Sequence, residues 1–318
     1  MRQNNFFLML LKVFFFSSIL VATSAVRAEL KVVTTIKPLH SLIANVMDGV
    51  GEPALIIEGS TSPHSFTLKP SHAKLLEEAD IIFWVGESIE TFMERPLESI
   101  VKNAEVVEFM EVESINKLKF REESIFEDHD DHDDHDDHDD HSGHDHHGHA
   151  HGEFDAHIWL DPMNAKEMVH EIAHELGDLD PANKNKYEAN AQATIQALDQ
   201  LVNDIEKGIN KDAKFVVFHD AYQYFEERFG VRAAGALTLN TDVLPGAKQI
   251  ADIQDVIKDR GIKCIFSEPQ FNPKIITTIA EDMNIKTGVF DPLGANIDSN
   301  KDLYFKLIQN LGNELKGC

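Results

Sequence analysis

Residues 180–209 read DPANKNKYEANAQATIQALDQLVNDIEKGI, and they predict one uninterrupted amphipathic helix. Asp180 followed by Pro181 is the pairing typical of a helix N-cap and a first helical position. Beyond it, apolar side chains recur every three or four residues: Tyr187, Ala191, Ile195, Leu198, Val202, Ile205 and Ile209. At 1.5 Å per residue, some thirty residues give a helix about 45 Å long. We therefore expect a rigid connecting helix, predicted over residues 179–211.

Strand-like and helix-like patterns alternate on both sides of this helix. The predicted strands before it are Leu30–Thr35, Ala54–Ile57, Ile81–Gly86 and Ala104–Phe109. Those after it are Lys214–His219, Lys263–Ser267 and Thr287–Phe290, with a helix at about 246–259. Continuous apolar strands that alternate with helices are typical of parallel sheets covered on both faces. The sequence thus predicts an α/β protein with two (β/α) domains, residues 29–178 and 212–318, joined by the long helix.

A tract rich in histidine and aspartate interrupts the first predicted domain. Residues 127–155 contain thirteen acidic residues and no Lys or Arg, so this tract carries half of the net charge of −26. Ten of the seventeen histidines lie there: His129, His132, His135, His138, His141, His144, His146, His147, His149 and His151. Such a composition cannot build a packed core, but it binds borderline transition-metal ions. We expect a disordered insertion, about 122–153, that binds metal with low affinity. The alternative is a solvated acidic linker, which would need no imidazoles.

The first 28 residues resemble a secretory signal. Arg2 precedes a nearly uninterrupted apolar run from Phe6 to Val21, and small residues follow up to Ala28. The alternative is a membrane anchor, but the small residues favour cleavage after Ala28. Because no later segment is long and apolar enough to span a bilayer, we expect a soluble, exported protein with no membrane insertion after signal removal. No basic face is available for nucleic acid, so the natural ligand of this acidic chain is a cation.

The chain has two cysteines, Cys264 and Cys318. In an oxidising compartment an even number of cysteines favours a disulfide. Closing a loop of about 55 residues would stabilise the fold by roughly 4 kcal/mol in the chain-entropy model. The competing interpretation is that one cysteine supplies a metal thiolate.

Three histidines outside the tract share one structural context. His64 follows the predicted strand 54–57, His157 lies in the apolar segment after the tract, and His219 ends the strand 214–219. In open α/β sheets, ligands bind at the carboxyl ends of strands. Since two of these histidines come from the first domain and one from the second, they can meet only in the interdomain cleft. Three neutral imidazoles with one open position suit tetrahedral Zn²⁺. The alternative is that each is an ordinary histidine hydrogen-bonded near a strand end.

A second histidine motif has a different meaning. His170-Glu171-Ile172-Ala173-His174 spells the His-Glu-x-x-His signature of zinc proteases. In a chain with seventeen histidines and many glutamates such a match is weak, and no third, distant ligand pattern accompanies it.

Six short segments together carry a resemblance to a known family. They are Ser62–Phe66, Ala79–Gly86, Ala156–Pro162, Phe218–Tyr222, Ser267–Phe271 and Asp291–Gly294. From about Lys31 to the C-terminus, the chain resembles the periplasmic zinc-binding proteins of zinc-uptake ABC transporters, the ZnuA type. A His- and Asp-rich insertion before the second ligand is typical of the zinc-specific members.

The resemblance implies two (β/α) domains joined by a long backbone helix, with the metal between them. It places the three histidine ligands on His64, His157 and His219, and a C-terminal disulfide on Cys264 and Cys318. Some members carry a glutamate before the first histidine as a possible fourth ligand, whereas this chain has Pro63. The fourth ligand is therefore expected to be water or, second, Asp291, because manganese-binding relatives use a carboxylate from that region. Those relatives also tend to carry a carboxylate in place of His219, so the imidazole favours Zn²⁺ over Mn²⁺.

The sequence thus predicts an exported monomer that captures Zn²⁺ and delivers it to an ABC permease and its ATPase, without catalysis. One rival is a zinc-dependent hydrolase, since three histidines and a water also describe a catalytic site. The other is a passive periplasmic metal buffer in which only the tract matters.

Overall fold

The computed structural model describes residues 29–126, 153–239, 241 and 244–318. The predicted signal, residues 1–28, and the ten histidines of the tract lie outside the described residues. Two four-stranded sheets form the centre of the described structure. The first has the order β2-β1-β3-β4, built from β1 (Val32–Thr34), β2 (Ala54–Leu55), β3 (Ile81–Trp84) and β4 (Glu105–Glu108). The second has the order β6-β5-β7-β8, built from β5 (Phe215–His219), β6 (Ala236–Thr238), β7 (Cys264–Ser267) and β8 (Lys286–Val289).

Every pairing between these strands is parallel, as predicted. The central strands β1, β3 and β5 are buried along their whole length, which explains why they read as continuous apolar runs. Strand β6 was not predicted. It is three residues long and follows Ala233, Ala234 and Gly235, residue types with little preference for strands.

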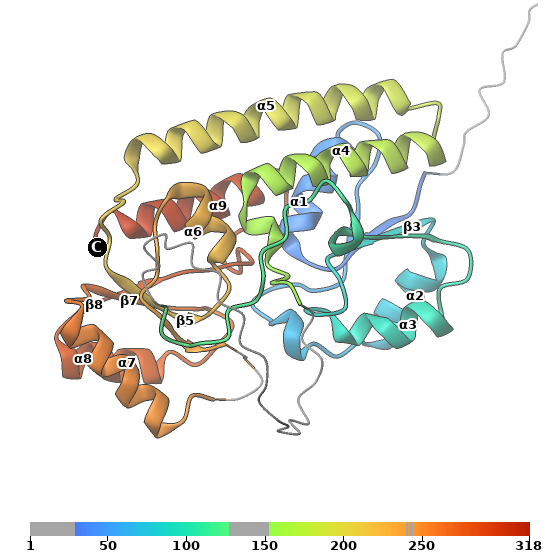
Figure 1. Ribbon diagram of the computed structural model, residues 1–318. Helices are drawn as coiled ribbons and strands as arrows, with labels where there is room; N and C mark the ends of the chain where they lie inside the picture. The colour runs from blue at the N-terminus through green and yellow to red at the C-terminus, as the bar shows by residue number, and fades with distance from the viewer. Residues whose placement is uncertain (1–28, 127–152, 240, 242–243) are drawn as a thin grey trace, which may run out of the picture.

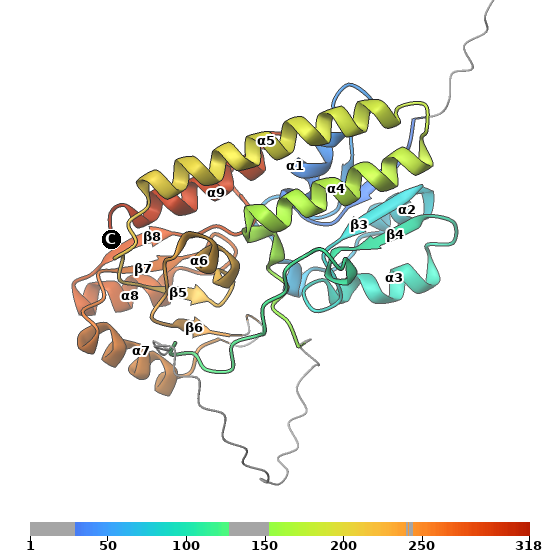
Figure 2. The ribbon, with the colours of Figure 1, turned by 45° about the horizontal axis from the view of Figure 1, so that its top comes forward.

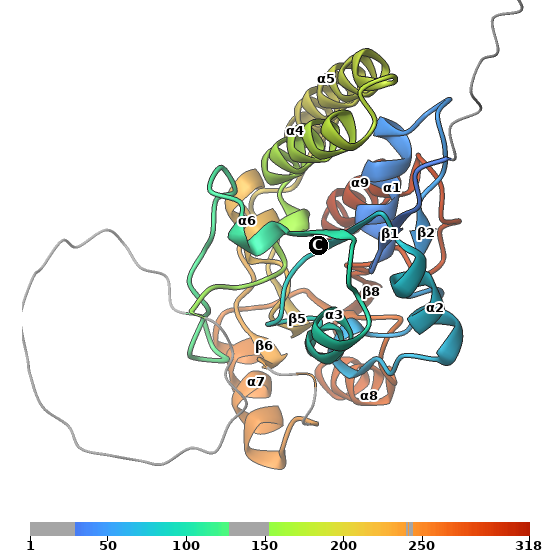
Figure 3. The ribbon, with the colours of Figure 1, turned by 90° about the vertical axis from the view of Figure 1, so that its right-hand side faces the viewer.

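Helices cover both sides of the two sheets. Those of the first half are α1 (Lys37–Val46), α2 (Pro70–Glu78), α3 (Glu94–Ser99) and α4 (Pro162–Leu179), with short 3-10 turns η1 (Pro63–Ser65), η2 (Thr91–Met93), η3 (Phe109–Glu111) and η4 (Ile158–Leu160). Those of the second half are α5 (Lys184–Gly208), α6 (Gln223–Phe229), α7 (Ala247–Asp259), α8 (Lys274–Met283) and α9 (Leu303–Leu315). Helices α4 and α5 run along one side of the molecule above α1 and α9, whereas α2, α3, α7 and α8 lie on the opposite side (Figures 1 and 3).

The long connecting helix is present, but its predicted start is wrong. Helix α5 has 25 residues and begins at Lys184 instead of at the Asp180-Pro181 pair. Asp180 ends α4, and its carboxylate accepts hydrogen bonds from Asn183 Nδ2 at 2.6 Å and Tyr187 Oη at 3.2 Å. The residues Asp, Pro and Asn thus form a turn between α4 and α5, a role they favour as strongly as helix capping. Helix α5 is about 38 Å long at 1.5 Å per residue, and it packs against α1 and α9 from the two halves (Figure 2).

The segments on either side of the predicted insertion pack on the second sheet and its helix α6. Ile125 forms an antiparallel bridge with Gly235 beside β6, and Lys119 forms one with Phe154. Tyr224 of α6 donates from its hydroxyl to Asp155 O at 2.6 Å. The same hydroxyl accepts from the backbone N–H of Leu118 at 2.9 Å. Although these segments precede the long helix in the chain, their packing joins them to the second domain.

The two halves share packing and polar contacts. One buried hydrophobic cluster runs from α1 and the first sheet through α4 and α5 to α9 and the second sheet. Lys37 at the start of α1 is buried, and its Nζ donates to Gly294 O at 2.7 Å, Ala295 O at 3.1 Å and Ile297 O at 2.6 Å. These three hydrogen bonds from one lysine connect the first half to the second.

The predicted disulfide is confirmed. It joins Cys264 at the start of β7 to Cys318 just beyond α9, with the two Cα atoms 5.7 Å apart. The pair therefore fixes the end of the last helix to the second sheet. Within the described part of the chain, no helix has both the length and the apolar character needed to cross a membrane.

Candidate metal centre

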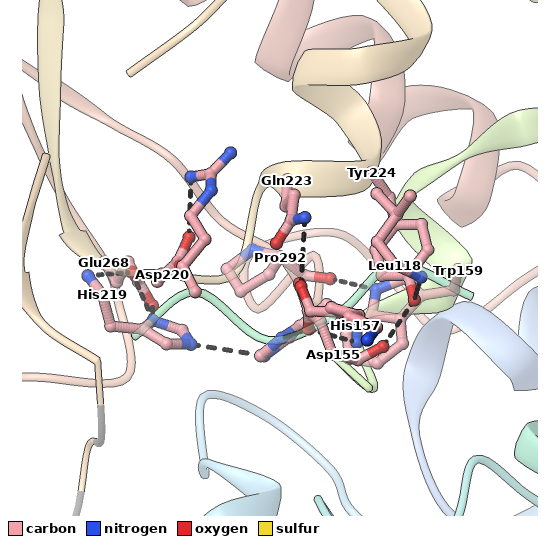
Figure 4. A network of polar contacts seen from close by, with 12 residues as sticks. Leu118, Asp155, His157, Trp159, His219, Asp220, Gln223, Tyr224, Glu268 and Pro292 are labelled. Carbon is pink, nitrogen blue, oxygen red and sulfur yellow. Dashed lines mark hydrogen bonds and ion pairs between the residues drawn. The ribbon is translucent and has the colours of Figure 1, made fainter. Parts of the chain in front are cut away.

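His64, His157 and His219 lie together where the two halves meet. One ring nitrogen from each can be chosen so that all three lie within 4.8 Å of one another. His157 Nε2 and His219 Nε2 are 3.3 Å apart (Figure 4). The ring centroids are separated by 5.6 Å for His64–His157, 5.8 Å for His64–His219 and 5.2 Å for His157–His219. Within the described residues this is the one group of three or more potential ligands so closely placed.

Each histidine lies in or next to a short regular element. His64 lies in η1, where the side chain of Ser62 accepts from the His64 backbone N–H at 3.3 Å and Pro63 restricts the first turn. His157 immediately precedes η4. His219 is the last residue of the buried strand β5. His219 thus follows the rule that places ligands at the carboxyl ends of parallel strands, whereas His64 lies in a 3-10 turn and His157 directly before one.

Two buried carboxylates orient two of the imidazoles. Asp155 Oδ1 lies 2.7 Å from His157 Nδ1 and also accepts from the His157 backbone N–H at 3.0 Å. Glu268 contacts His219 Nδ1 through both carboxylate oxygens, at 2.7 Å and 2.8 Å. A carboxylate at Nδ1 selects the tautomer with the proton on Nδ1, which leaves the Nε2 lone pair for a metal ion. Asp155 and Glu268 are 1% and 3% exposed, so both interactions are shielded from water.

More charged groups surround this pair of contacts. Arg121 Nη1 donates to Asp220 Oδ1 at 3.0 Å, and its Nη2 donates to Glu226 Oε2 at 2.7 Å. Burial raises the pKa of Asp220 to about 7, although the guanidinium of Arg121 opposes this rise. Burial alone would lower the pKa of His219, but the charge and hydrogen bond of Glu268, together with the charges of Asp220 and Asp155, outweigh burial and raise this pKa. The centre is therefore rich in buried negative charge, which a divalent cation would compensate.

Asp291, the alternative fourth ligand, uses its carboxylate to accept hydrogen bonds within the turn after β8 and from Gln270. Its Oδ1 accepts from the backbone N–H groups of Leu293 at 3.1 Å and Gly294 at 3.0 Å, and from Gln270 Nε2 at 3.0 Å. Its Oδ2 accepts from the backbone N–H of Ala295 at 2.6 Å. This carboxylate thus holds the turn after β8 together, and it does not belong to the three-histidine group.

Sequence reasoning missed the residues that support the three histidines. Asp155 lies two positions before His157, and Glu268 follows β7, so both stood inside or beside the segments that carry the family resemblance. Arg121 lies in a stretch without any regular pattern, and nothing in the sequence indicated its role. The two histidines of the His-Glu-x-x-His motif, His170 and His174, lie on the exposed face of α4 and not at this centre.

Comparisons with known proteins agree with this geometry. A model of the ZnuA family, described as "Zinc-uptake complex component A periplasmic", matches residues 32–318. The "High-affinity zinc uptake system protein ZnuA" of Brucella abortus (strain 2308) is 48% identical over 303 residues, which cover 90% of this chain and 91% of that protein. The protein of the same name from Yersinia pestis is 33% identical over 304 residues, which cover 95% of each. The solved structure "Crystal structure of ZnuA" has the same fold, with a TM-score of 0.71 at 22% identity, and covers 90% of this chain and 98% of its own. This chain belongs to the ZnuA family, the periplasmic A components of zinc-uptake complexes.

Proposed function

We propose that this protein captures Zn²⁺ in the periplasm and delivers it to the permease of an ABC transporter, where an ATPase powers uptake. The observation that carries the proposal is the convergence of His64, His157 and His219 from two halves of the chain, within 4.8 Å of one another. Membership of the zinc-uptake family supports the same function.

The three imidazoles are the proposed zinc ligands. Zn²⁺ prefers nitrogen and sulfur donors in tetrahedral geometry, with Zn–N distances of about 2.0–2.1 Å. The 3.3 Å between His157 Nε2 and His219 Nε2 is close to the edge of such a tetrahedron. Water is the proposed fourth ligand, because the carboxylate of Asp291 already accepts four hydrogen bonds. An ion bound through neutral imidazoles can be released without breaking a charge pair in the first coordination shell.

The two rival functions are less well supported. A zinc hydrolase needs a general base beside the metal-bound water, but Asp155 and Glu268 are already bound to imidazole Nδ1 atoms. A passive buffer would need the tract alone, whereas the described residues form a defined three-histidine centre. The family consists of binding proteins, and the protein is accordingly not an enzyme.

The remaining parts of the chain have proposed roles that fit this function. Residues 1–28 serve as a signal that is removed on export, and the mature protein acts as a soluble monomer. The ten histidines of the tract bind further zinc weakly and supply it to the interdomain site when zinc is scarce. The two domains are proposed to span residues 29–178 and 212–318, with α5 (Lys184–Gly208) as the connecting helix and the segments beside the tract packed on the second domain.

Replacement of single histidines tests the assignment of the ligands. We expect His64→Ala, His157→Ala and His219→Ala each to weaken zinc binding by roughly 3 kcal/mol, or about a hundredfold, because two imidazoles remain. Competition with a tight chelator, on the full chain, detects the strong site without interference from weaker ones. His72→Ala is the matched control, since His72 lies in α2 and bonds to the backbone N–H of Lys69. Unchanged zinc affinity in His219→Ala would show that the assignment is wrong.

A further inference from the structure

Helix α4 presents two histidines that the interdomain site does not use. His170 and His174 are four residues apart and exposed, whereas Val169, Ile172 and Ala173 between and beside them are buried. Side chains four residues apart on an α-helix lie on the same face, with Cβ atoms about 5–6 Å apart. Because α4 is a regular helix of 18 residues, the spacing of this pair is fixed by the backbone.

Two carboxylates of α4 lie close to His174. His174 Nδ1 lies 3.3 Å from Glu175 Oε1, and His174 Nε2 lies 4.0 Å from Asp178 Oδ2. Burial raises the pKa of Glu175, and the negative charge of Glu105 on β4 raises it further. Two carboxylates therefore lie beside His174, and their negative charge attracts cations.

We propose that His170 and His174 form a second, peripheral site for a divalent transition-metal ion such as Zn²⁺. Two imidazoles at this helical spacing can bind one ion at Zn–N distances of about 2.0–2.1 Å, as the His-x-x-x-His arrangement does in zinc enzymes. Asp178 stands four residues beyond His174 and is the candidate third ligand, in competition with Lys184, whose Nζ lies 3.0 Å from its Oδ1. Water completes the coordination.

This site differs in kind from the interdomain centre. His174 has 64% of its side chain exposed, so an ion there exchanges freely with solvent. Among the described residues, a preformed group of three ligands occurs at His64, His157 and His219 and not on α4. The site on α4 should accordingly bind zinc far more weakly than the interdomain centre does. Its His-Glu-x-x-His motif then binds zinc without any proteolytic activity. The inference does not depend on the ligands of the interdomain site.

Chemical footprinting of histidine in the full-length protein tests this inference without interference from the tract. Diethyl pyrocarbonate modifies free imidazole nitrogens, and peptide mapping by mass spectrometry reports each histidine separately. We expect added ZnCl₂ to protect His170 and His174 over the same concentration range, with roughly tenfold slower modification at zinc tenfold above the Kd. His72, which has no histidine four residues away, is the internal control and should keep its reactivity.

Two variants distinguish a chelate from independent histidines. In His174→Ala, we expect His170 to lose its protection at the same zinc concentration, because a single imidazole cannot chelate. The double variant His174→Ala/Glu175→His keeps both histidines but moves the second off the face of the first, and it should lose protection as well. Circular dichroism verifies that α4 remains folded in both variants. If zinc leaves His170 and His174 reactive, or if His170 is equally protected in His174→Ala, the inference is overturned.

Discussion

The imidazole rings at the metal centre are held by side chains that do not themselves reach the ion. Asp155 binds Nδ1 of His157, and Glu268 binds Nδ1 of His219. Each contact fixes the ring orientation and the tautomer before zinc arrives, so the free energy of binding is not spent on ordering the ligands. At the scale of single residues, the proposed zinc site thus depends on these carboxylates as well as on the histidines.

Replacing Glu268 by Gln should weaken zinc binding by about 10- to 100-fold, the usual effect of losing a partner of a metal-bound histidine. The amide keeps the shape and one acceptor oxygen, but it removes the charge that makes the imidazole a stronger ligand. Chelator competition measures the change. Glu281→Gln, on the exposed face of α8, is the matched control. Equal zinc affinity in Glu268→Gln and the parent would contradict a supporting role for Glu268.

Zinc affinity should also depend on pH through His219. Burial opposes protonation of His219, yet the charge of Glu268 raises its pKa above the ordinary value of 6.5. A proton on Nε2 excludes zinc, so affinity should be constant above the raised pKa and fall as the pH drops through it. The decline therefore starts above pH 6.5, and chelator competition between pH 8 and pH 5.5 measures it. In Glu268→Gln the decline should begin at a lower pH, whereas a parent affinity that stays flat down to pH 6 would refute the prediction.

The stability of the metal-free protein should show the opposite dependence on pH. Because the pKa of His219 is raised on folding, its interaction with Glu268 stabilises the fold fully below the unfolded value. This stabilisation is lost as the pH rises through the folded pKa. Urea unfolding of the metal-free protein at several pH values, with Glu268→Gln as the comparison, measures this contribution. A difference between the two proteins that does not shrink towards high pH would argue against it.

Individual elements position the centre through their ends. Strand β5 ends in His219 and strand β7 is followed by Glu268, so the register between these neighbouring strands brings ligand and carboxylate together. The antiparallel bridge between Lys119 and Phe154 positions Asp155, because Asp155 directly follows Phe154 in the chain. Helix α6 also supports Asp155, since the hydroxyl of Tyr224 hydrogen-bonds to the backbone of both Leu118 and Asp155.

The disulfide between β7 and the end of α9 is an element-scale constraint with a measurable free energy. Cys318→Ser should lower the free energy of unfolding by about 4 kcal/mol, because the bridged residues are 54 positions apart. Urea unfolding gives this value, and the reduced parent protein serves as the control. Zinc affinity should remain unchanged, because the metal centre contains three histidines and no thiolate. A weaker zinc site in Cys318→Ser would instead favour a cysteine ligand.

At the scale of the whole molecule, the two halves form one packed body. Helix α5 contacts helices of both halves, the buried apolar cluster is continuous across them, and Lys37 donates to three carbonyls of the other half. Figure 1 shows α5 running along most of the length of the molecule, with α4 beneath its right-hand part.

Deleting residues 128–151 should leave one tight zinc site and remove several weaker ones. The tight site survives because Asp155 and His157 are positioned by Leu118 and Tyr224, which remain in the shortened chain. Uptake should suffer mainly when zinc is scarce. Calorimetric titration of the deleted and full-length proteins counts the sites, and loss of the tight site on deletion would show that the tract belongs to the primary site.

Much of this architecture follows from local patterns in the chain. Buried parallel strands read as continuous apolar runs, and the apolar period of Tyr187 to Ile205 predicts the connecting helix. The position of His219 at the end of a predicted strand is a local feature too. With the segments that contain His64 and His157, it supported the prediction that the three histidines meet. The cysteine pair was predictable because the sequence has two cysteines and resembles an exported protein at its N-terminus.

Which polar side chains meet was decided only in the tertiary structure, both within a turn and between distant segments. The turn at Asp180 depends on its bonds to Asn183 and Tyr187, which a capping pattern does not reveal. Glu268 lies 49 residues from His219, and Arg121 lies 99 residues from Asp220, with no periodicity to connect either pair. Periodicity records which face of an element is buried, because burial acts on each residue separately. Which polar groups then meet is set by how whole elements pack, and that packing is a property of the tertiary structure.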